Sequence, residues 1–377
     1  MRQNVKIRQF RWQQWHVFRL FRNFVYSINY LNSTMTGYIN LSAFLIGCTT
    51  TFFTICALYT LYWQKQRTRY QTILGSIMAI WAIWNLKDIV ITFPGMYTAK
   101  VLNWILIIDG WSALTFTVLL YEIVKPGWTT GKRLIKLSLP FLLFTIVYAI
   151  WPDKRVIYAY LTFLWFYAWT IVFIGYVKVR RHIQYVRINY SNIDKIDVSW
   201  LKPVFIFAIV SQLAWLFTSL FAEVTADIVY YISVIAMWVM VLHYSWDYKP
   251  IVEIDDEEES TQKNPLPIAD GVLEQMVEEK QLYLNKNLML SDIAQALGTN
   301  RTYVSNYLSQ VRGQTFYDYI NQMRIEKVSI PLMHVHPEYK LEFIASESGF
   351  ASISTFRRAF VRLTGQTPSQ YVATKEQ

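Results

Sequence analysis

Two copies of one short motif decide the fold of the C-terminal part of this chain: LSDIAQALG at residues 290–298 and LEFIASESG at residues 341–349. In each copy a small alanine follows the isoleucine, which lets a second helix approach closely. Four residues later a glycine supplies a turn with a positive φ angle, which is least costly without a Cβ. The copies begin 51 residues apart, and each is followed by a segment that carries arginine. The pattern predicts two helix-turn-helix motifs.

Helical periodicity continues between and beyond the two copies. Apolar residues at spacings of three and four predict recognition helices over Arg301–Val311 and Ser352–Leu363. A longer helix over Phe316–Ile330 is expected to connect the two motifs. The C-terminal part is therefore predicted to be a soluble, all-α domain.

The preceding part of the chain has a different composition. The whole sequence is 54% hydrophobic and 17% aromatic, and its apolar residues are concentrated between Tyr38 and Trp246. This content exceeds that of ordinary soluble proteins and indicates a membrane section, in which each span needs about 20 apolar residues. Seven stretches meet this requirement, near residues 38–62, 72–93, 101–124, 134–151, 156–177, 203–222 and 226–246. We therefore predict an all-α, polytopic bundle of about seven transmembrane helices ahead of the soluble domain.

The loops between these stretches differ in charge. The first, third and fifth loops hold 13 basic residues: Lys65, Arg67, Arg69, Lys125, Lys132, Arg133, Lys136, Lys178, Arg180, Arg181, Arg187, Lys195 and Lys202. The alternating loops hold Lys100, Lys154 and Arg155. Because basic loops stay in the cytoplasm, this asymmetry predicts a cytoplasmic C-terminal domain.

Residues 1–34 conflict with this topology. They contain six basic residues and no acidic residue, yet seven spans place them outside the cytoplasm. Three hypotheses remain: a basic amphipathic arm on a membrane surface, an additional span, or translation that naturally begins at Met35. We favour the last, in which residues 1–34 are upstream sequence without a fold.

An acidic linker separates the membrane part from the soluble domain. Within residues 249–269, six acidic residues cluster between positions 253 and 259, and three prolines oppose helix formation. One interpretation is a solvated tether, and the other is an acidic strap that covers the recognition helices until a signal arrives. The predicted parts of the chain are thus residues 1–34, 35–248, 249–269 and 270–377.

The net charge of +10 does not come from the C-terminal domain. Residues 270–377 hold 11 Lys or Arg and 11 Asp or Glu. However, no acidic residue occurs within 293–317 or 348–375, so both expected recognition helices are locally positive. Local clustering, rather than overall charge, therefore favours nucleic-acid binding.

A few charged residues fall within the predicted spans, where they are costly. Asn85, Lys87 and Asp88 lie near the outer end of the second stretch, and Asp109 lies at a similar depth in the third. Together they form a candidate intramembrane signal site or a charged pair that breaks on switching. The alternative is a structural salt bridge between adjacent helices.

No catalytic or metal-binding pattern is found in the sequence. Cys48 and Cys56 are the only cysteines, and both lie in the first apolar stretch, which excludes a disulfide framework and a cysteine-based zinc site. The segment GWTTGK at residues 127–132 is too short for a phosphate-binding loop. We expect neither enzymatic activity nor a cofactor.

A specific set of glycine, aromatic and small residues marks the C-terminal domain. Its main members are Ile293, Ala294, Leu297, Gly298, Gly313, Phe316, Tyr319, Ile320, Arg324, Glu326, Ile344, Ala345, Gly349, Phe350, Phe356, Arg358, Phe360, Thr364, Gly365, Pro368 and Tyr371. With these residues the domain resembles the DNA-binding domain of AraC/XylS-type bacterial transcription regulators. The resemblance implies two helix-turn-helix motifs held by a linking helix, with recognition helices in successive major grooves. It does not extend to the membrane part.

Carried over by position, the resemblance implies base-reading residues in both recognition helices: Thr302, Ser305, Asn306, Ile353, Ser354 and Arg358. Arg358 has the strongest chemical support, since a guanidinium pairs with two acceptors of guanine, whereas Asn306 can read adenine. Further arginines are expected to contact phosphates: Arg301, Arg312, Arg357 and Arg362.

Three positions depart from the family's pattern. Val328 stands where the family usually has alanine, and Pro331 falls near the end of the linking helix. Pro331 is expected to end that helix early and to loosen the coupling between the motifs. Phe343 occupies a commonly polar position and is expected to dock against a partner or the rest of the domain.

These observations predict a membrane-embedded transcription regulator of the bacterial inner membrane, with its C-terminal domain in the cytoplasm. Its expected partners are double-stranded DNA, the lipid bilayer, a second copy of the chain, and a lipophilic or small-molecule signal or membrane protein. Two alternatives remain. One is a transporter or membrane enzyme with a regulatory C-terminal domain, and the other is a passive membrane anchor on a DNA-binding domain.

Overall fold

The computed structural model describes residues 32–63, 67–89, 98–221, 224–246, 248–251 and 271–375. Helices predominate in this part of the chain and no strand occurs in it, which confirms the all-α prediction. The basic segment at residues 1–34 and the acidic linker lie almost entirely outside the described residues. The interpretations of both segments therefore stay predictions.

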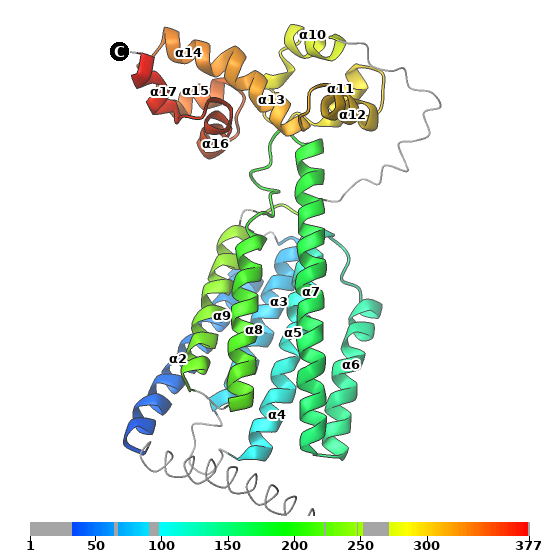
Figure 1. Cartoon of the computed structure of the whole chain (residues 1–377), viewed down its shortest axis with the longest axis vertical. Coiled ribbons are helices and arrows are strands. Elements are labelled where there is room, and N and C mark those ends of the chain that lie inside the picture. Colours follow the sequence, from blue (N-terminus) through cyan, green and yellow to red (C-terminus); the bar gives the residue numbers. More distant parts are fainter. Residues whose placement is uncertain are drawn as a thin grey trace, which may run out of the picture. The chain divides into compact units, whose positions relative to one another are not determined.

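The helices that precede the linker are shown in Figure 1 and follow in chain order: α2 (Asn32–Leu58), the π-helical η1 (Tyr59–Trp63), α3 (Arg69–Asp88), α4 (Ala99–Gly110), α5 (Ser112–Val124), α6 (Gly131–Ile150), α7 (Lys154–Asn189), α8 (Leu201–Phe221) and α9 (Val224–Ser245). The elements that follow the linker are α10 (Val272–Glu279), the 3₁₀-helical η3 (Leu282–Leu284), α11 (Leu290–Ala296), α12 (Arg301–Val311), α13 (Phe316–Arg324), the π-helical η4 (Ile325–Ser329), α14 (Ile330–Val335), α15 (Leu341–Glu347), α16 (Ile353–Thr364) and α17 (Pro368–Lys375).

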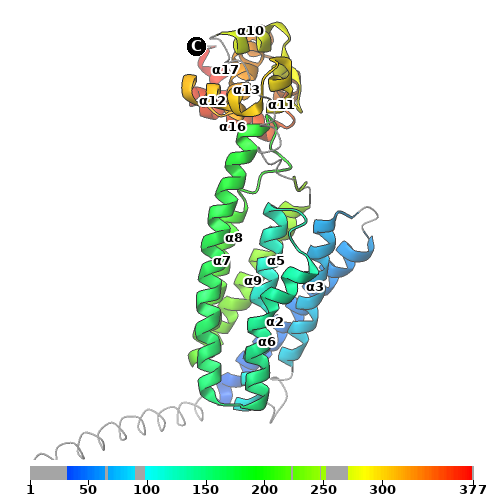
Figure 2. The same ribbon diagram turned by 90° about the vertical axis from the view of Figure 1, so that its right-hand side faces the viewer.

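The chain divides into two compact units that alternate along the sequence. The first compact unit consists of residues 1–116, 134–168 and 206–239. The second compact unit consists of residues 117–133, 169–205 and 240–377. Helix α7 is one continuous helix, as Figure 2 shows, and its last part belongs to the second compact unit. The residues just after α7 therefore belong to the same unit as the C-terminal domain.

Aromatic side chains form a core of the first compact unit. Trp81 of α3 packs against Phe53 of α2 and Trp238 of α9, with ring centroids 5.3 and 5.5 Å apart. Phe116 of α5 stacks on Trp238 at 5.5 Å. The Trp81 indole N–H donates a hydrogen bond to the Thr115 hydroxyl across 3.0 Å, so its one polar group is satisfied inside the core. Helices α2, α3, α5 and α9 are thereby held around one apolar cluster.

Among the described residues, five helical stretches are long and apolar enough to cross a membrane: Ala43–Trp63, Ala99–Val124, Gly131–Ile150, Lys154–Asn189 and Ile228–Ser245. The apolar stretch of α8 is shorter, and α3 does not meet the requirement. In α6 only 11% of the most apolar window is buried, so most of its apolar side chains face outward, as lipid contact requires. A helix occurs at each predicted stretch, but the predicted count of seven spans is not confirmed and stays a prediction.

Two apolar cores build the C-terminal domain, one for each helix-turn-helix motif. The first core contains Ile293 of α11 and Val304 of α12, both fully buried. The second core contains Phe356 and Phe360 of α16, also fully buried. Phe350 meets Phe356 edge to face, with ring centroids 5.3 Å apart. Each recognition helix is therefore fixed by a core of its own.

The linking helix runs without a break from Phe316 to Val335, through α13, η4 and α14. The prediction that Pro331 ends this helix early is wrong. The π-helical η4 ends at Ser329, two residues before the proline, which lies in the first turn of α14. The wider turn of η4 reduces the clash between the proline ring and the preceding carbonyl groups. The Ser329 hydroxyl donates to the Arg324 carbonyl across 3.2 Å and so satisfies an acceptor within the widened turn. The two helix-turn-helix motifs share one unbroken linking helix.

Candidate nucleic-acid interface

The first helix-turn-helix motif consists of α11 and α12. Ala294 is 2% exposed in its core, in agreement with the small side chain expected there. Gly298 forms the turn with φ +64°, and no atom lies within 4 Å of the place its Cβ would occupy. The Asn300 side chain caps α12 by accepting a hydrogen bond from the Tyr303 amide at 3.0 Å. Val304 anchors α12 in the core and leaves the opposite face of this helix exposed.

The second helix-turn-helix motif consists of α15 and α16 and has a tighter turn. Gly349 has φ +83°, and a Cβ there would lie 2.8 Å from the carbonyl oxygens of Tyr283 and Leu284. Glycine is therefore required both by the backbone conformation and by the close approach of η3. Ser352 caps α16, because its hydroxyl accepts a hydrogen bond from the Thr355 amide at 3.2 Å. Both glycines predicted to form the turns are confirmed.

The predicted base-reading residues lie on the surfaces of α12 and α16. The exposed ones are Thr302, Asn306, Ser354 and Arg358, and the half-buried ones are Ser305 and Ile353. Thr302, Ser305 and Asn306 are spaced by three or four positions in α12, so they share one face. In α16 the same holds for Ser354 and Arg358, which are four positions apart, whereas Ile353 points to the side of that face. Their role as DNA contacts stays a prediction.

The predicted phosphate-contacting arginines have different surroundings. Arg357 is exposed. Arg312 pairs with Glu274 at 2.7 Å and Arg362 pairs with Asp318 at 2.6 Å, and the two arginine side chains are 46% and 55% exposed. Exposed ion pairs of this kind contribute about 0–1 kcal/mol, so either arginine can exchange its carboxylate for a phosphate at small cost.

Arg301 differs from these three because it is buried. Its residue is 5% exposed, and its Nη1 donates to the Asn189 side-chain oxygen at 3.4 Å. Arg301 is the first residue of α12 and therefore lies at the N-terminal end of a recognition helix, but it is buried there. In this arrangement it is the least accessible of the predicted phosphate contacts.

Arg324 ties the linking helix to η3 and to the second motif. It is 1% exposed, and it donates to the Tyr283 carbonyl at 2.7 Å and to the Asn285 carbonyl at 2.8 Å. Its guanidinium also lies 5.4 Å from the centre of the Phe350 ring in the second motif. Burial lowers the pKa of Arg324 to about 10, which leaves the group charged at neutral pH. This buried cation therefore connects η3 and the second motif through one side chain.

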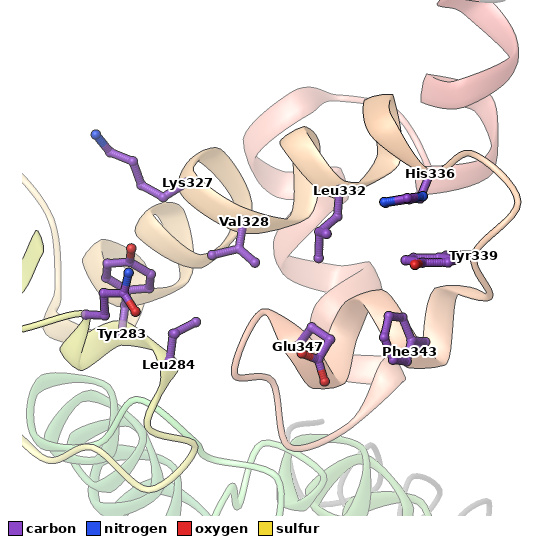
Figure 3. Close-up of a pocket in the computed structure, with 10 residues that line it drawn as sticks. Tyr283, Leu284, Lys327, Val328, Leu332, His336, Tyr339, Phe343 and Glu347 are labelled. Atoms are coloured by element: carbon purple, nitrogen blue, oxygen red, sulfur yellow. The ribbon is translucent and has the colours of Figure 1, made fainter.

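An open pocket of 440 Å³ lies beside the linking helix, as Figure 3 shows. Val328 and Leu332 line it from the linking helix, and Phe343 lines it from α15. Phe343 is 47% exposed and meets the Tyr339 ring edge to face at 4.9 Å. Phe343 thus packs on Tyr339, four residues earlier, and its docking against a partner or against the rest of the domain stays a prediction. None of the predicted base-reading residues lines this pocket.

The predicted intramembrane cluster lies in the first compact unit. Lys87 Nζ is 2.6 Å from Asp88 Oδ1 and 2.6 Å from Asp109 Oδ1, so one ammonium joins α3 to α4. Asn85 is not part of this ion cluster, because its side-chain oxygen accepts a hydrogen bond from the Thr49 hydroxyl at 3.2 Å. The structure therefore brings together three of the four predicted residues. Signal sensing by this cluster stays a prediction.

The segment after α7 makes contacts that no sequence motif indicates. Asp194 accepts hydrogen bonds from Thr355 and Arg358, and Ser191 accepts one from Arg324. In the sequence this loop stands out for its basic residues. Ser191 and Arg324 are 133 positions apart, a separation at which local periodicity carries no information. An acidic residue within a basic loop is the one signal that could have drawn attention to Asp194.

Comparisons with known proteins agree with this geometry. Residues 293–374 match a family described as "Helix-turn-helix domain". The chain is 28% identical over 102 residues to an uncharacterised HTH-type transcriptional regulator of Staphylococcus aureus, which covers 27% of this chain and 13% of the relative. It is 38% identical over 89 residues to the TCP pilus virulence regulatory protein of Vibrio cholerae, which covers 24% of this chain and 31% of that protein. No solved structure matches the chain.

The fold and these similarities define the class of the C-terminal domain. Residues 293–374 match a helix-turn-helix domain, and the relatives support an AraC-type, DNA-binding transcription regulator. The chain spans less than a third of the length of each of these two relatives. The similarities therefore concern the helix-turn-helix domain and not the apolar helices that precede it.

Proposed function

We propose that this chain is a membrane-embedded transcription regulator that binds duplex DNA sequence-specifically. The observation that carries the proposal is the pair of motifs, α11–α12 and α15–α16, mounted on one linking helix. Both recognition helices are free of acidic residues and expose most of their predicted reading residues. Two such helices on one support can enter successive major grooves on one face of the duplex.

In the proposed complex the two recognition helices differ in chemistry. Arg358 of α16 donates two hydrogen bonds to O6 and N7 of a guanine, and Arg357 beside it neutralises a phosphate. Asn306 of α12 pairs with N6 and N7 of an adenine. The remaining contacts to base edges come from Thr302, Ser305, Ile353 and Ser354.

The proposal assigns the apolar helices to the bacterial inner membrane and the C-terminal domain to the cytoplasm. The long apolar helices support a membrane location, and the excess of basic residues in alternating loops supports this orientation. Outward-facing residues of α6 such as Leu143, 61% exposed, and Ile150, 79% exposed, suit lipid contact. Two copies held in one bilayer also gain effective concentration for each other, which favours binding as a dimer.

The Lys87 cluster is the proposed point at which a signal acts on the membrane part. One ammonium faces two carboxylates, and the three side chains are 12–23% exposed. Charged groups at such a depth are costly, so each depends on the partners it has. A lipophilic or small ligand that competes for the Lys87 ammonium or for Asp109 changes the contact between α3 and α4.

Genome-wide DNA crosslinking tests the function, with wild type, Arg358→Ala and Lys280→Ala at equal expression. Lys280 is an exposed residue at the end of α10, so its substitution removes a positive charge from the same domain without touching a recognition helix. Wild type and Lys280→Ala are expected to enrich the same sites, and Arg358→Ala is expected to lose them. If wild type enriches no site, the proposed DNA binding is wrong.

Reporter fusions test the orientation. A reporter that is active only in the cytoplasm, fused after Gln377, is expected to be active, whereas one that requires export is expected to be silent. The reverse pattern separates the C-terminal domain from the chromosome and contradicts the proposal.

A further inference from the structure

The segment that continues α7, residues 189–197 and here named the α7 extension, lies against the C-terminal domain. Tyr190 forms an antiparallel backbone bridge with Met289. The Ser191 amide and hydroxyl both donate to the Leu288 carbonyl, at 3.1 and 2.8 Å. These contacts fix the α7 extension beside the residues that precede α11.

Further contacts hold the α7 extension against the linking helix. Arg324 donates from Nη1 to the Ser191 carbonyl and from Nη2 to the Ser191 hydroxyl, each at 3.3 Å. On the other side of this contact, Ile193 and Ile196 pack with Tyr317, and all three are at most 9% exposed. The α7 extension is therefore docked by both polar and apolar contacts.

The docked segment brings a carboxylate to the N-terminal end of the second recognition helix. Asp194 Oδ1 accepts a hydrogen bond from the Thr355 hydroxyl and another from Arg358 Nη2, the latter at 3.4 Å. Thr355 lies in the first turn of α16, where the helix dipole favours negative charge. A helix N-terminus, a hydroxyl and a guanidinium are also the groups that contact DNA phosphates. Asp194 therefore occupies an anion site that duplex DNA can use.

The same segment reaches the first recognition helix. The Asn189 side chain, at the end of α7, accepts a hydrogen bond from Arg301, the first residue of α12. The N-terminal ends of both recognition helices thus face one segment. Because the N-terminal residues of a recognition helix contact base edges, the α7 extension and duplex DNA compete for the same positions.

We propose that the α7 extension is a built-in inhibitor of DNA binding, in which Asp194 takes the place of a DNA acceptor group at Thr355 and Arg358. The inference rests on the proposed function, because it concerns the regulation of that same DNA site. In the docked arrangement Arg358 is paired and an approaching duplex meets the negative charge of Asp194. Release of the α7 extension frees Arg358 and removes the like charge, and both changes favour DNA.

The contact is arranged so that it can open. Asp194 Oδ2 is buried and accepts no hydrogen bond from the described residues, which makes the pairing incomplete. The Arg358 side chain remains 62% exposed. Because the α7 extension directly continues α7, a rotation or axial shift of this helix moves Asn189 and the residues after it. A signal that displaces α7 thereby shifts the equilibrium between docked and released states.

DNA binding by the full-length chain in lipid nanodiscs tests the inhibitor, with Asp194→Asn compared with Asp197→Asn. Asp197 carries the same charge in the same segment, but its carboxylate accepts hydrogen bonds from Ser199, at 2.9 and 2.6 Å. The probe is a random-sequence duplex library of about 40 base pairs, long enough for successive major grooves. Bound sequences are selected in parallel for each variant, and affinities are then measured on the selected duplexes.

Asp194→Asn is expected to bind the duplex about 5- to 30-fold more tightly than wild type, because a larger fraction of the protein is competent to bind. Asp197→Asn is expected to match wild type. Equal affinities of wild type and Asp194→Asn overturn the inhibitor while leaving the proposed function intact. An equal gain in DNA affinity in both variants means that only the loss of a negative charge matters, wherever it lies in the segment. That result also overturns the inhibitor. If no variant selects any sequence, the proposed function itself fails.

A disulfide across the backbone bridge tests whether docking itself inhibits. Tyr190→Cys and Met289→Cys are combined with Cys48→Ala and Cys56→Ala, since directly opposed residues of an antiparallel pair are close enough for a disulfide. The oxidised protein is expected to bind the duplex at least about tenfold more weakly than the reduced protein. Equal binding in both forms means that the docked arrangement accepts DNA, which overturns the inhibitor. Failure of the cysteines to cross-link contradicts the docked arrangement.

Discussion

The two helix-turn-helix motifs share a sequence pattern and a local fold, yet they are built into the domain differently. Gly298 turns the first motif in open space, whereas Gly349 turns the second against the carbonyl groups of η3. The first recognition helix exposes uncharged groups such as Asn306, and the second exposes arginines such as Arg358. The second motif is therefore more tightly fixed to its neighbours, and its recognition helix carries three arginines against one in α12.

Two copies of one motif can thus contribute differently to the binding of DNA. We infer that the second motif supplies most of the attraction for DNA and the guanine readout, while the first supplies orientation and neutral hydrogen bonds. The α7 extension fits this division, because its carboxylate is held by Thr355 and Arg358 of the second motif. An inhibitor gains most by covering the motif that contributes most to affinity.

The largest expected effect contrasts the two turn glycines. Gly349→Ala is expected to destabilise the domain by about 3 kcal/mol or more, because a positive φ adds roughly 1 kcal/mol and the new Cβ collides with backbone atoms that cannot move aside. Gly298→Ala is expected to cost about 1 kcal/mol, since only the φ penalty applies. Pulse proteolysis of the full-length protein across a urea series measures both. Equal losses contradict the contrast between the turns.

Arg324 offers a way to break the connection between the motifs. Arg324→Met fills a similar volume but leaves the buried carbonyl of Tyr283 and the partly buried carbonyl of Asn285 without their donor, for a loss of about 2 kcal/mol. Hydrogen exchange is expected to rise first in α15 and α16, because the guanidinium also contacts Phe350 of the second motif. Tyr339→Phe, which keeps the ring and leaves this network untouched, serves as the control. Uniform exchange across both motifs contradicts a connecting role for Arg324.

Much of this domain follows from local sequence pattern. The turn glycines, the recognition helix Arg301–Val311 and the linking helix were predictable, because periodicity and capping act over a few residues. The early helix end at Pro331 was wrong, since a single proline cannot reveal that a π-helical turn precedes it. The burial of Arg301 was also missed, because its neighbour Asn189 comes from a distant part of the chain.

The docking of the α7 extension lay beyond prediction for the same reason. Thr355 and Asp194 are 161 positions apart, so their contact depends on where two separately folded segments meet. The sequence did suggest an acidic cover for the recognition helices, but in the linker, where six acidic residues cluster. In the inhibitor proposed above, Asp194 of the α7 extension fills that place. The density of acidic residues along a sequence is thus a weaker indicator of which carboxylate covers a recognition helix than the position of that residue in the fold.

Substitutions of predicted base-reading residues measure how much each recognition helix contributes to DNA affinity. Arg358→Ala is expected to weaken binding to selected duplexes about 10- to 100-fold, because a bidentate contact to guanine is lost. Asn306→Ala is expected to weaken binding about 3- to 10-fold, since an uncharged amide loses less on removal from the interface. Fluorescence anisotropy at one fixed salt concentration measures both. A larger loss for Asn306→Ala reverses the proposed division of tasks.

The smallest expected effect concerns salt dependence and separates free from paired arginines. Arg357→Ala is expected to reduce the slope of log affinity against log salt by about 0.9, the value for one lost phosphate contact. Arg312→Ala is expected to change the slope by less, because Arg312 already pairs with Glu274 at 2.7 Å. When Arg312 contacts a phosphate instead, the Glu274 carboxylate loses its partner and attracts a cation from solution. The net number of cations released on DNA binding is therefore smaller.

Glu274→Gln tests this reasoning directly. This change leaves Arg312 without its carboxylate partner, so the slope of log affinity against log salt is expected to steepen. Adding Arg312→Ala to Glu274→Gln is then expected to reduce this slope by about as much as Arg357→Ala does. If Arg312→Ala has the same effect with and without Glu274, the ion pair does not compete with DNA. In that case Arg312 contributes as freely as Arg357, and the contrast between the motifs rests on their turns and reading residues alone.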